Sequence, residues 1–379
     1  MEILRWAGFF VGLLAVVATA GSVLRSLVVP RGLSAKLFYV VARAIRTGFL
    51  GIANRSDDYE TKDRILARQA PTFLLVLLFT WLTIFFLGYA LMLWPLVDDD
   101  FGQALLESGS SMLTLGFAGT HTSGATAVHF LASATGLVVV ALQIGYLPTL
   151  YGAFNRRETL VTMLQSRAGA PAWGIEILLR HHAVDLLDRL GDLYADWERW
   201  AADVTESHTN YPVLLYFRSP HPLRSWIVGL LAVMDSAAIC LALSPTLAPA
   251  EARLCLRMGF VCLRNIGDFM RIDYDPDPLP DDPIQLTFEE FKAGVALLEE
   301  RGFPAERSAE DAWPHFRGWR VNYEALAYEI ADAVVAPPGP WSGPRQHLPG
   351  MEIIPQRPPD RQPHDHRLNE RAKGEGIGA

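Results

Sequence analysis

The segment from Glu107 to Gly119 combines small, polar and glycine residues in an order that could bind a cation through its backbone. It reads ESGSSMLTLGFAG, and Gly116 supplies backbone angles that other residues reach only with strain. When consecutive carbonyl oxygens point toward one axis, they can replace the hydration shell of an ion. The hydroxyl of Thr114 could add a further oxygen ligand. This chemistry requires neighbouring elements that hold the segment rigidly.

The composition favours a chain with one membrane-embedded part and one soluble part. Of its 379 residues, 50% are hydrophobic and the mean hydropathy is positive, whereas 20% charged residues are too many for a wholly embedded protein. The formal net charge is -8, and no basic run occurs outside the juxtamembrane segments, so we expect no nucleic-acid partner. The cysteines Cys240, Cys255 and Cys262 lack CxxC spacing, and we expect buried thiols rather than a metal site.

Three stretches without formal charge predict membrane-spanning helices. Trp6 to Leu24 is long enough to cross about 30 Å of hydrocarbon, and it defines an N-terminal anchor over residues 1–29. The second span covers Pro71 to Val97, and the third covers Ala127 to Phe154. Cleavage of residues 1–20 as a signal peptide remains the alternative for the first stretch, because that segment ends in small residues typical of a cleavage site.

The distribution of Lys and Arg predicts the orientation of these spans. Residues 30–70 form a basic amphipathic segment, which is either an interfacial cuff in the lipid headgroup region or a solvated topology signal. Arg156 and Arg157 follow the third span. Because positively charged loops are retained in the cytoplasm, we expect a multi-pass protein of the plasma membrane. Its N-terminus would lie outside and its C-terminus in the cytoplasm, with membrane lipid as a partner.

The uncharged sequence that starts at Ser108 is longer than the third span requires. Phe101 to Gly119 is therefore expected outside the spans, as a re-entrant segment on the outer face. Irregular backbone at membrane depth is tolerated only where protein buries it or where it lines a water-filled cavity. Asp98, Asp99 and Asp100 precede the segment and either form a solvated acidic loop or place negative charge where cations arrive.

Span, short helix, Thr-Leu-Gly-Phe turn and span together resemble the two-helix pore module of the potassium-channel superfamily, whose filter reads Thr-Val/Ile-Gly-Tyr/Phe-Gly. The resemblance covers residues 71–155, and an additional N-terminal helix precedes it. The filter-like residues are Thr114, Leu115, Gly116, Phe117, Ala118 and Gly119. Ser110 and Ser111 lie where that family has polar residues at the end of the pore helix.

The resemblance implies a homotetramer that conducts a monovalent cation, with potassium as the expected ion and no cofactor. Ala118 departs from the family pattern, because it replaces the second filter glycine. If position 118 has a positive φ, alanine costs on the order of 1 kcal/mol there. A distorted outer site, lower ion selectivity or a pore that does not conduct would each follow from this departure.

Two residues of the third span are candidate hinges for gating. Gly136 lies near the position at which related inner helices carry a glycine that lets them bend, although glycine also permits close helix packing. Pro148 removes a backbone hydrogen bond and could kink the cytoplasmic end of the span.

Residues 156–336 predict a soluble helical domain, and residues 337–379 predict a disordered Pro-rich tail. Thr287 and Glu290 form a capping box that opens one helix of this domain. We expect the helix that follows to break near Pro314 and Gly318.

The apolar stretch Trp226 to Leu247 is either a buried core helix or a fourth span, and Asp235 at its centre favours the core helix. His181, His182 and His208 lack the sequence frame of any known catalytic or metal motif, so we expect no enzyme and no metal site. The sequence therefore predicts an all-α membrane protein with three transmembrane helices, a re-entrant pore helix and filter, and an α-helical cytosolic domain.

The leading hypothesis is a potassium-channel-like cation channel subunit, whose cytosolic domain regulates or assembles the pore and binds a regulator that the sequence does not identify. The alternative is a non-conducting membrane protein that retains a channel-like fold and serves in signalling or as a scaffold.

Overall fold

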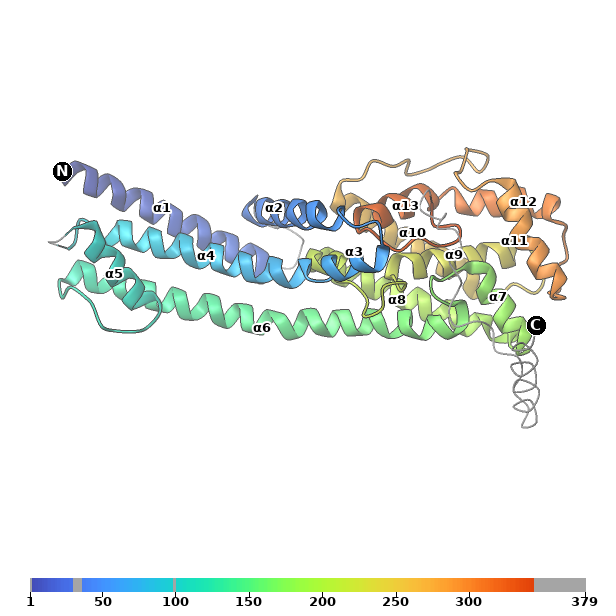
Figure 1. The fold of residues 1–379 in the computed structure, drawn as a ribbon, viewed down its shortest axis with the longest axis horizontal. Coiled ribbons are helices and arrows are strands. Elements are labelled where there is room, and N and C mark those ends of the chain that lie inside the picture. Colours follow the sequence, from blue (N-terminus) through green and yellow to red (C-terminus); the bar gives the residue numbers. More distant parts are fainter. Residues whose placement is uncertain (1, 30–35, 98–99, 344–379) are drawn as a thin grey trace, which may run out of the picture. The chain divides into compact units, whose positions relative to one another are not determined.

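A computed structural model describes residues 2–29, 36–97 and 100–343 of the chain (Figure 1). Helices account for 74% of the structure, and no strand occurs among these residues, so the predicted all-α class is confirmed. The helices, in chain order, are α1 (Glu2–Leu27), α2 (Lys36–Ala53), α3 (Tyr59–Leu66), α4 (Gln69–Leu93), α5 (Phe101–Met112), α6 (Ser123–Ala168), α7 (Gly174–Ala183), η1 (Leu187–Arg189), α8 (Leu190–Asn210), η2 (Pro212–Tyr216), α9 (Trp226–Leu243), α10 (Ala250–Met270), α11 (Phe288–Glu300), α12 (Ala309–Arg320) and α13 (Glu324–Ala333).

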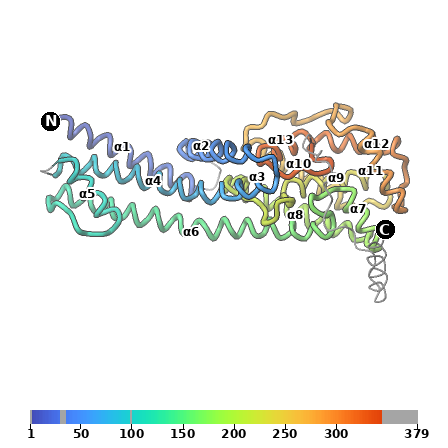
Figure 2. Tube along the Cα trace, viewed as in Figure 1, coloured from blue at the N-terminus to red at the C-terminus, as the bar shows by residue number. Residues whose placement is uncertain are grey.

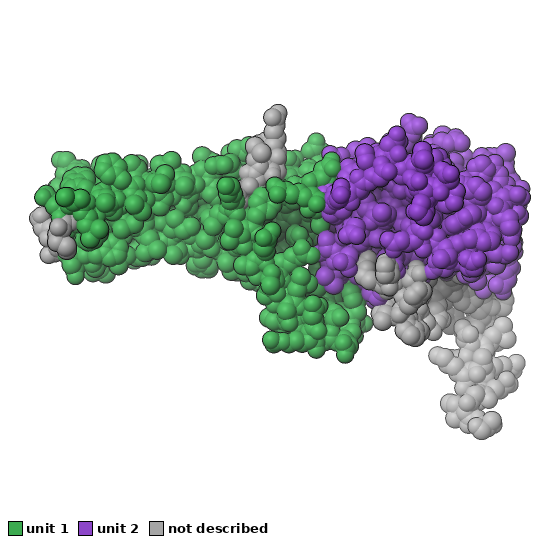
Figure 3. Space-filling model, turned by 90° about the horizontal axis from the view of Figure 1, so that it is seen from above, with its two compact units in different colours: residues 1–158, 202–222, 268–271 green, residues 159–201, 223–267, 272–379 purple. Residues whose placement is uncertain are grey.

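The chain divides into two compact units, which have different colours in Figure 3. Unit 1 contains the residues up to Glu158 together with 202–222 and 268–271, and unit 2 contains the other described residues. Helices α6, α8 and α10 contribute to both units. Each unit has its own set of buried hydrophobic side chains.

Four helical stretches are long and apolar enough to cross a membrane, which is compatible with a membrane protein. In three of them, Glu2–Leu27, Tyr59–Leu93 and Ser123–Ala168, only 22% to 39% of the apolar window is buried. These helices therefore leave apolar surface for lipid or for another protein chain. The fourth, Trp226–Leu243, is 100% buried, which leaves no face for lipid and favours the core helix over a fourth span.

In unit 1, α4 packs along α1, and the two helices run side by side in Figure 2. Their contact is close because Gly12 and Gly88 face each other: a Cβ on Gly12 would lie 2.4 Å from the carbonyl oxygen of Gly88. Small residues let helix backbones approach in this way, as in many membrane helix pairs. The Trp81 indole, fully buried, donates a hydrogen bond to Ser22 Oγ at 3.1 Å and adds a polar contact between the same helices.

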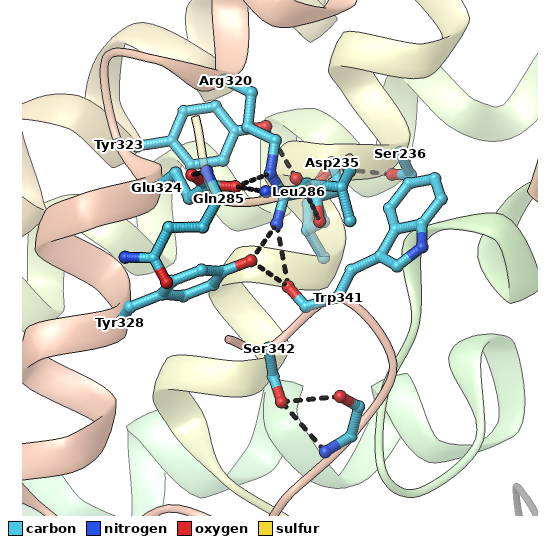
Figure 4. A network of polar contacts seen from close by, with 12 residues as sticks. Asp235, Ser236, Gln285, Leu286, Arg320, Tyr323, Glu324, Tyr328, Trp341 and Ser342 are labelled. Atoms are coloured by element: carbon cyan, nitrogen blue, oxygen red, sulfur yellow. Dashed lines mark hydrogen bonds and ion pairs between the residues drawn. The ribbon is translucent and has the colours of Figure 1, made fainter. Parts of the chain in front are cut away.

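In unit 2, α9 is the central helix, and α7, α12 and α13 pack around it. It carries one charged residue, Asp235, whose carboxylate lies 2.5 Å from Nη1 of Arg320 on α12 (Figure 4). Tyr323 donates a hydrogen bond to the same carboxylate at 2.7 Å, and Glu324 lies 2.8 Å from Nε of Arg320. Burial alone would lower the pKa of Arg320, but the Asp235 and Glu324 carboxylates raise it well above its ordinary value. A charged group in the centre of an apolar helix is thus paired inside unit 2.

The Arg320 network also fixes the end of the described chain. Arg320 and Tyr328 both donate hydrogen bonds to the carbonyl oxygen of Trp341, at 2.8 and 3.0 Å. The indole of Trp341 is buried and lies beside Phe316, with ring centroids 5.8 Å apart. Residues 337–343 of the predicted Pro-rich tail therefore pack in unit 2, whereas 344–379 lie outside the described residues.

The predicted break near Pro314 and Gly318 is wrong, because α12 continues through both residues and ends at Arg320. Pro314 removes one backbone hydrogen bond. The burial of Phe316 and Arg320 on the following turn holds the helix together despite that loss.

Candidate pore segment

Helix α5 follows α4 and is fixed at both ends by local contacts. The Asp100 side chain caps its first turn by accepting a hydrogen bond from the Gln103 amide at 3.1 Å, which is a typical N-cap contact. The Ser108 hydroxyl donates to the carbonyl oxygen of Phe86 on α4 at 2.8 Å. Asp100 therefore has a structural role in this chain, whereas Asp98 and Asp99 lie outside the described residues.

The filter-like residues form a turn between α5 and α6, and Ser110 holds the amide side of that turn. The amides of Leu115 and Gly116 donate to the carbonyl oxygen of Ser110 at 2.8 and 3.2 Å, and the amide of Ala118 donates to its hydroxyl at 3.0 Å. Among the hydrogen bonds of the described residues, none is accepted by a carbonyl oxygen of residues 114–119. The turn thus bonds to α5 through several of its amides, whereas its carbonyl oxygens form no such bond to the described residues.

Backbone strain in the turn lies at Thr114 rather than at Ala118. Thr114 has a φ of 55° and Gly116 has a φ of 69°, whereas Ala118 is not among the residues with positive φ. The strain expected at Ala118 is therefore absent in this chain. A β-branched residue with positive φ is unusual and costs on the order of 1–3 kcal/mol. The Thr114 amide, which donates to Ser111 at 2.9 Å, helps to hold this conformation.

A buried carboxylate connects α5, the turn and α6. Glu107 is only 1% exposed, and its carboxylate accepts hydrogen bonds from the amide and the hydroxyl of Thr120 at 3.1 and 2.8 Å. Nε2 of His129 on α6 lies 3.2 Å from the same carboxylate, and Nδ1 of His129 lies 2.7 Å from Ser111 Oγ. Sequence reasoning assigned no role to Glu107 or His129. An acidic residue beside a long uncharged run, and a histidine within an apolar span, were the available signals.

The side chains of the turn point away from the rest of the chain. Leu115 is 61% exposed and Phe117 is 65% exposed. A Cβ added at Gly116 would meet no atom within 4 Å. The segment is therefore anchored on one side and open on the other in a single chain.

The two candidate hinges have different environments. A Cβ on Gly136 would lie 2.1 Å from the carbonyl oxygen of Met112, the last residue of α5. This distance gives Gly136 a packing role and accounts for glycine at that position without a hinge. Pro148 lies inside α6, which continues to Ala168, and its role in gating stays a prediction.

A second buried polar cluster lies at the end of the unit 1 portion of α6. Arg157 is fully buried, and its guanidinium donates to the carbonyl oxygens of Leu214 and Phe217 at 2.8 and 2.7 Å and to Glu158. Nη1 of Arg157 also lies 3.0 Å from Nε2 of His208. Since an arginine can only donate, Nε2 accepts and His208 is neutral. Burial, together with the Arg157 guanidinium, holds the pKa of His208 well below its usual 6.5.

No family model, no curated protein and no solved structure matches this chain. Within the described ranges, no three His, Cys, Asp or Glu side chains lie close enough together to hold a metal ion. The resemblance of the turn to a potassium-channel filter therefore stays a prediction from the sequence.

Proposed function

We propose that this chain is the subunit of a homotetrameric cation channel, with potassium as the expected ion. The observation that carries the proposal is the turn at residues 114–119, whose amides bond toward α5 while its carbonyl oxygens accept no hydrogen bond from the described residues. Carbonyl oxygens presented in this way can replace the hydration shell of a cation. The turn also lies between two apolar helices, α4 and α6, which are long enough to cross a membrane.

The exposed surface of α6 supports association with further copies of the chain. Phe130, Leu137, Ile144 and Tyr151 are exposed and spaced seven residues apart, so they lie along one face of the helix. The exposed side chain of Phe117 adds apolar surface at the turn. One chain supplies only a part of a coordination ring, and four copies around one axis would complete it.

In this proposal the chain is a multi-pass protein of the plasma membrane, with unit 2 in the cytoplasm, where it regulates or assembles the pore. Ala118 favours a second candidate, a non-conducting membrane protein for signalling or scaffolding that retains a channel-like fold. Alanine at this position removes a glycine that the family's filter contains, and a ring built without it can lose its outer ion site.

Flux from liposomes tests the proposal. The purified protein should release potassium from loaded vesicles, barium should block the release, and the protein should migrate as a tetramer in mild detergent. Gly116→Ala should lower the flux, because alanine is strained at a φ of 69°. Gly48→Ala on α2 is the matched control, since a Cβ there also meets no atom within 4 Å.

Absence of flux at every voltage, pH and calcium concentration, from protein that forms the tetramer, would favour the non-conducting candidate. A monomeric protein that shows no flux would contradict both the proposed tetrameric ring and the proposed cation pore.

A further inference from the structure

Unit 2 contains a cavity of about 500 Å³ that is open to the surface, between α10, α12 and the loop that precedes α11. This volume lies in the range of about 300–1,000 Å³ that is typical of small-molecule sites. The cavity belongs to neither the turn after α5 nor the Arg320 network. Its lining includes two arginines and two aromatic residues: Arg257, Arg264, Phe260 and Trp319.

The spacing of these residues places them on one face of each of two helices. Arg257, Phe260 and Arg264 lie three and seven residues apart on α10, so they share one face of that helix. His315 and Trp319 lie four residues apart on α12 and form the second wall. Both helices are labelled in Figure 1, and both walls belong to unit 2.

The two arginines of this cavity differ from Arg157 and Arg320 in their contacts. Arg157 and Arg320 are each surrounded by carbonyl or carboxylate oxygens. The side chains of Arg257 and Arg264, in contrast, form no hydrogen bond or ion pair with any described residue, and Nε of Arg264 is buried without a partner. A buried donor without a partner costs free energy, and an anion in the cavity would satisfy it.

Charge and shape indicate the class of anion. An arginine guanidinium donates two parallel hydrogen bonds, and this geometry matches a phosphate group. Among the residues that line the cavity, the two arginines outnumber one acidic residue, Asp277. A phosphate therefore finds both charge and donors in the cavity.

The aromatic residues indicate a planar group beside the phosphate. The Phe260 ring stacks on Tyr323, with centroids 5.7 Å apart and an interplanar angle of 23°, which fixes the orientation of the ring. Trp319 lines the cavity from α12, and an indole is a side chain on which a flat ring can stack. Pro280, in the loop that precedes α11, lies close to α12, since a Cβ on Gly318 would be 3.4 Å from the Cβ of Pro280. The loop therefore approaches the helix closely.

We propose that this cavity binds a small organic anion made of a phosphate group and a planar ring, of the nucleoside monophosphate class. Arg257 and Arg264 bind the phosphate, and Trp319 stacks on the ring. The site is independent of ion conduction, because its residues all belong to unit 2 and its occupancy can be measured without flux.

Equilibrium dialysis of the full-length protein in detergent, with AMP as the probe, tests this site. We expect saturable binding of AMP, at least tenfold tighter than that of adenosine or inorganic phosphate, since each of these keeps only one of the two groups. Arg264→Gln and Trp319→Leu should each weaken AMP binding at least tenfold. Arg253→Gln is the matched control, because Arg253 is exposed on the same helix and does not line the cavity.

Thermal unfolding of each variant separates a lost ligand contact from a lost fold. If Arg264→Gln unfolds early, Arg257→Gln replaces it, since Arg257 is exposed and its side chain forms no hydrogen bond or ion pair with a described residue. The proposal is overturned if AMP shows no saturable binding to the wild-type protein, or if folded Arg257→Gln and Trp319→Leu proteins bind AMP as tightly as the Arg253→Gln control.

Discussion

Replacing Gly136 with alanine should displace α5 and the turn that it holds. The added Cβ would lie 2.1 Å from the carbonyl oxygen of Met112, whereas real Cβ contacts are essentially never shorter than 3.0 Å, so one helix must move by at least about 0.9 Å (3.0 minus 2.1). The obstacle is backbone and cannot rotate away. Overpacking of this kind lowers the stability of the folded state by about 1–3 kcal/mol. Alanine is more favourable than glycine in a helix interior by up to about 1 kcal/mol, which offsets part of that loss. Because Ser110 and Ser111 accept the amides of the turn, the movement would reach residues 114–118.

Thermal unfolding of the full-length protein in detergent measures this effect. We expect the midpoint of thermal unfolding of Gly136→Ala to fall by about 2–4 °C for each kcal/mol of lost stability, as is typical of a unit of this size. Gly145→Ala is the matched control, because it lies on the same helix and an added Cβ meets no atom within 4 Å. Equal midpoints for the two variants would refute the close contact between Gly136 and Met112.

Two further predictions concern buried charge. Arg320→Met should lower the free energy of unfolding of unit 2 by about 3–5 kcal/mol in urea titrations, because it leaves the Asp235 carboxylate buried without its partner. The control Arg317→Met, on the same helix and only partly buried, should change this free energy by about 0.5 kcal/mol or less, and similar losses in both variants would argue against the network. His208 should make unit 1 less stable in acid: its pKa lies below the unfolded value of 6.5, so the unfolded chain takes up the proton first as the pH falls below about 6.5. The loss is at most about 1.4 kcal/mol per pH unit, and His208→Gln should remove that part of the slope in melting curves between pH 7 and pH 5, whereas an unchanged slope would assign the acid sensitivity to other groups.

The sequence predicted the helices whose signals are local. The charge-free stretch from Pro71 contains nearly all of α4, which begins two residues earlier at Gln69, because length and lack of charge are properties of the segment itself. The capping box at Thr287 and Glu290 does open α11, since its two hydrogen bonds join residues three apart. The continuity of α12 through Pro314 could not be predicted in the same way. It depends on the burial of Phe316 and Arg320 against residues distant in the sequence.

The same distinction between local signals and contacts of distant residues applies to the candidate site. The position of the turn and the polar residues Ser110 and Ser111 follow from a short motif between two apolar stretches, and Ser110 does contact the turn. The buried contacts of Glu107 with Thr120 and His129 join residues 13 and 22 positions apart, and no local pattern specifies them. Long-range pairing of single polar residues therefore limited what the sequence could predict here.

The meaning of Ala118 changes once its backbone is known. Its φ is not positive, and its amide bonds to the Ser110 hydroxyl, so a Cβ is tolerated and a glycine is not needed to hold the turn in one chain. A family glycine at this position would then matter for the path of carbonyl oxygens in an assembled ring rather than for folding. In the proposed channel, the departure at Ala118 is therefore expected to affect ion selectivity, while the strain of the turn in the single chain is concentrated at Thr114.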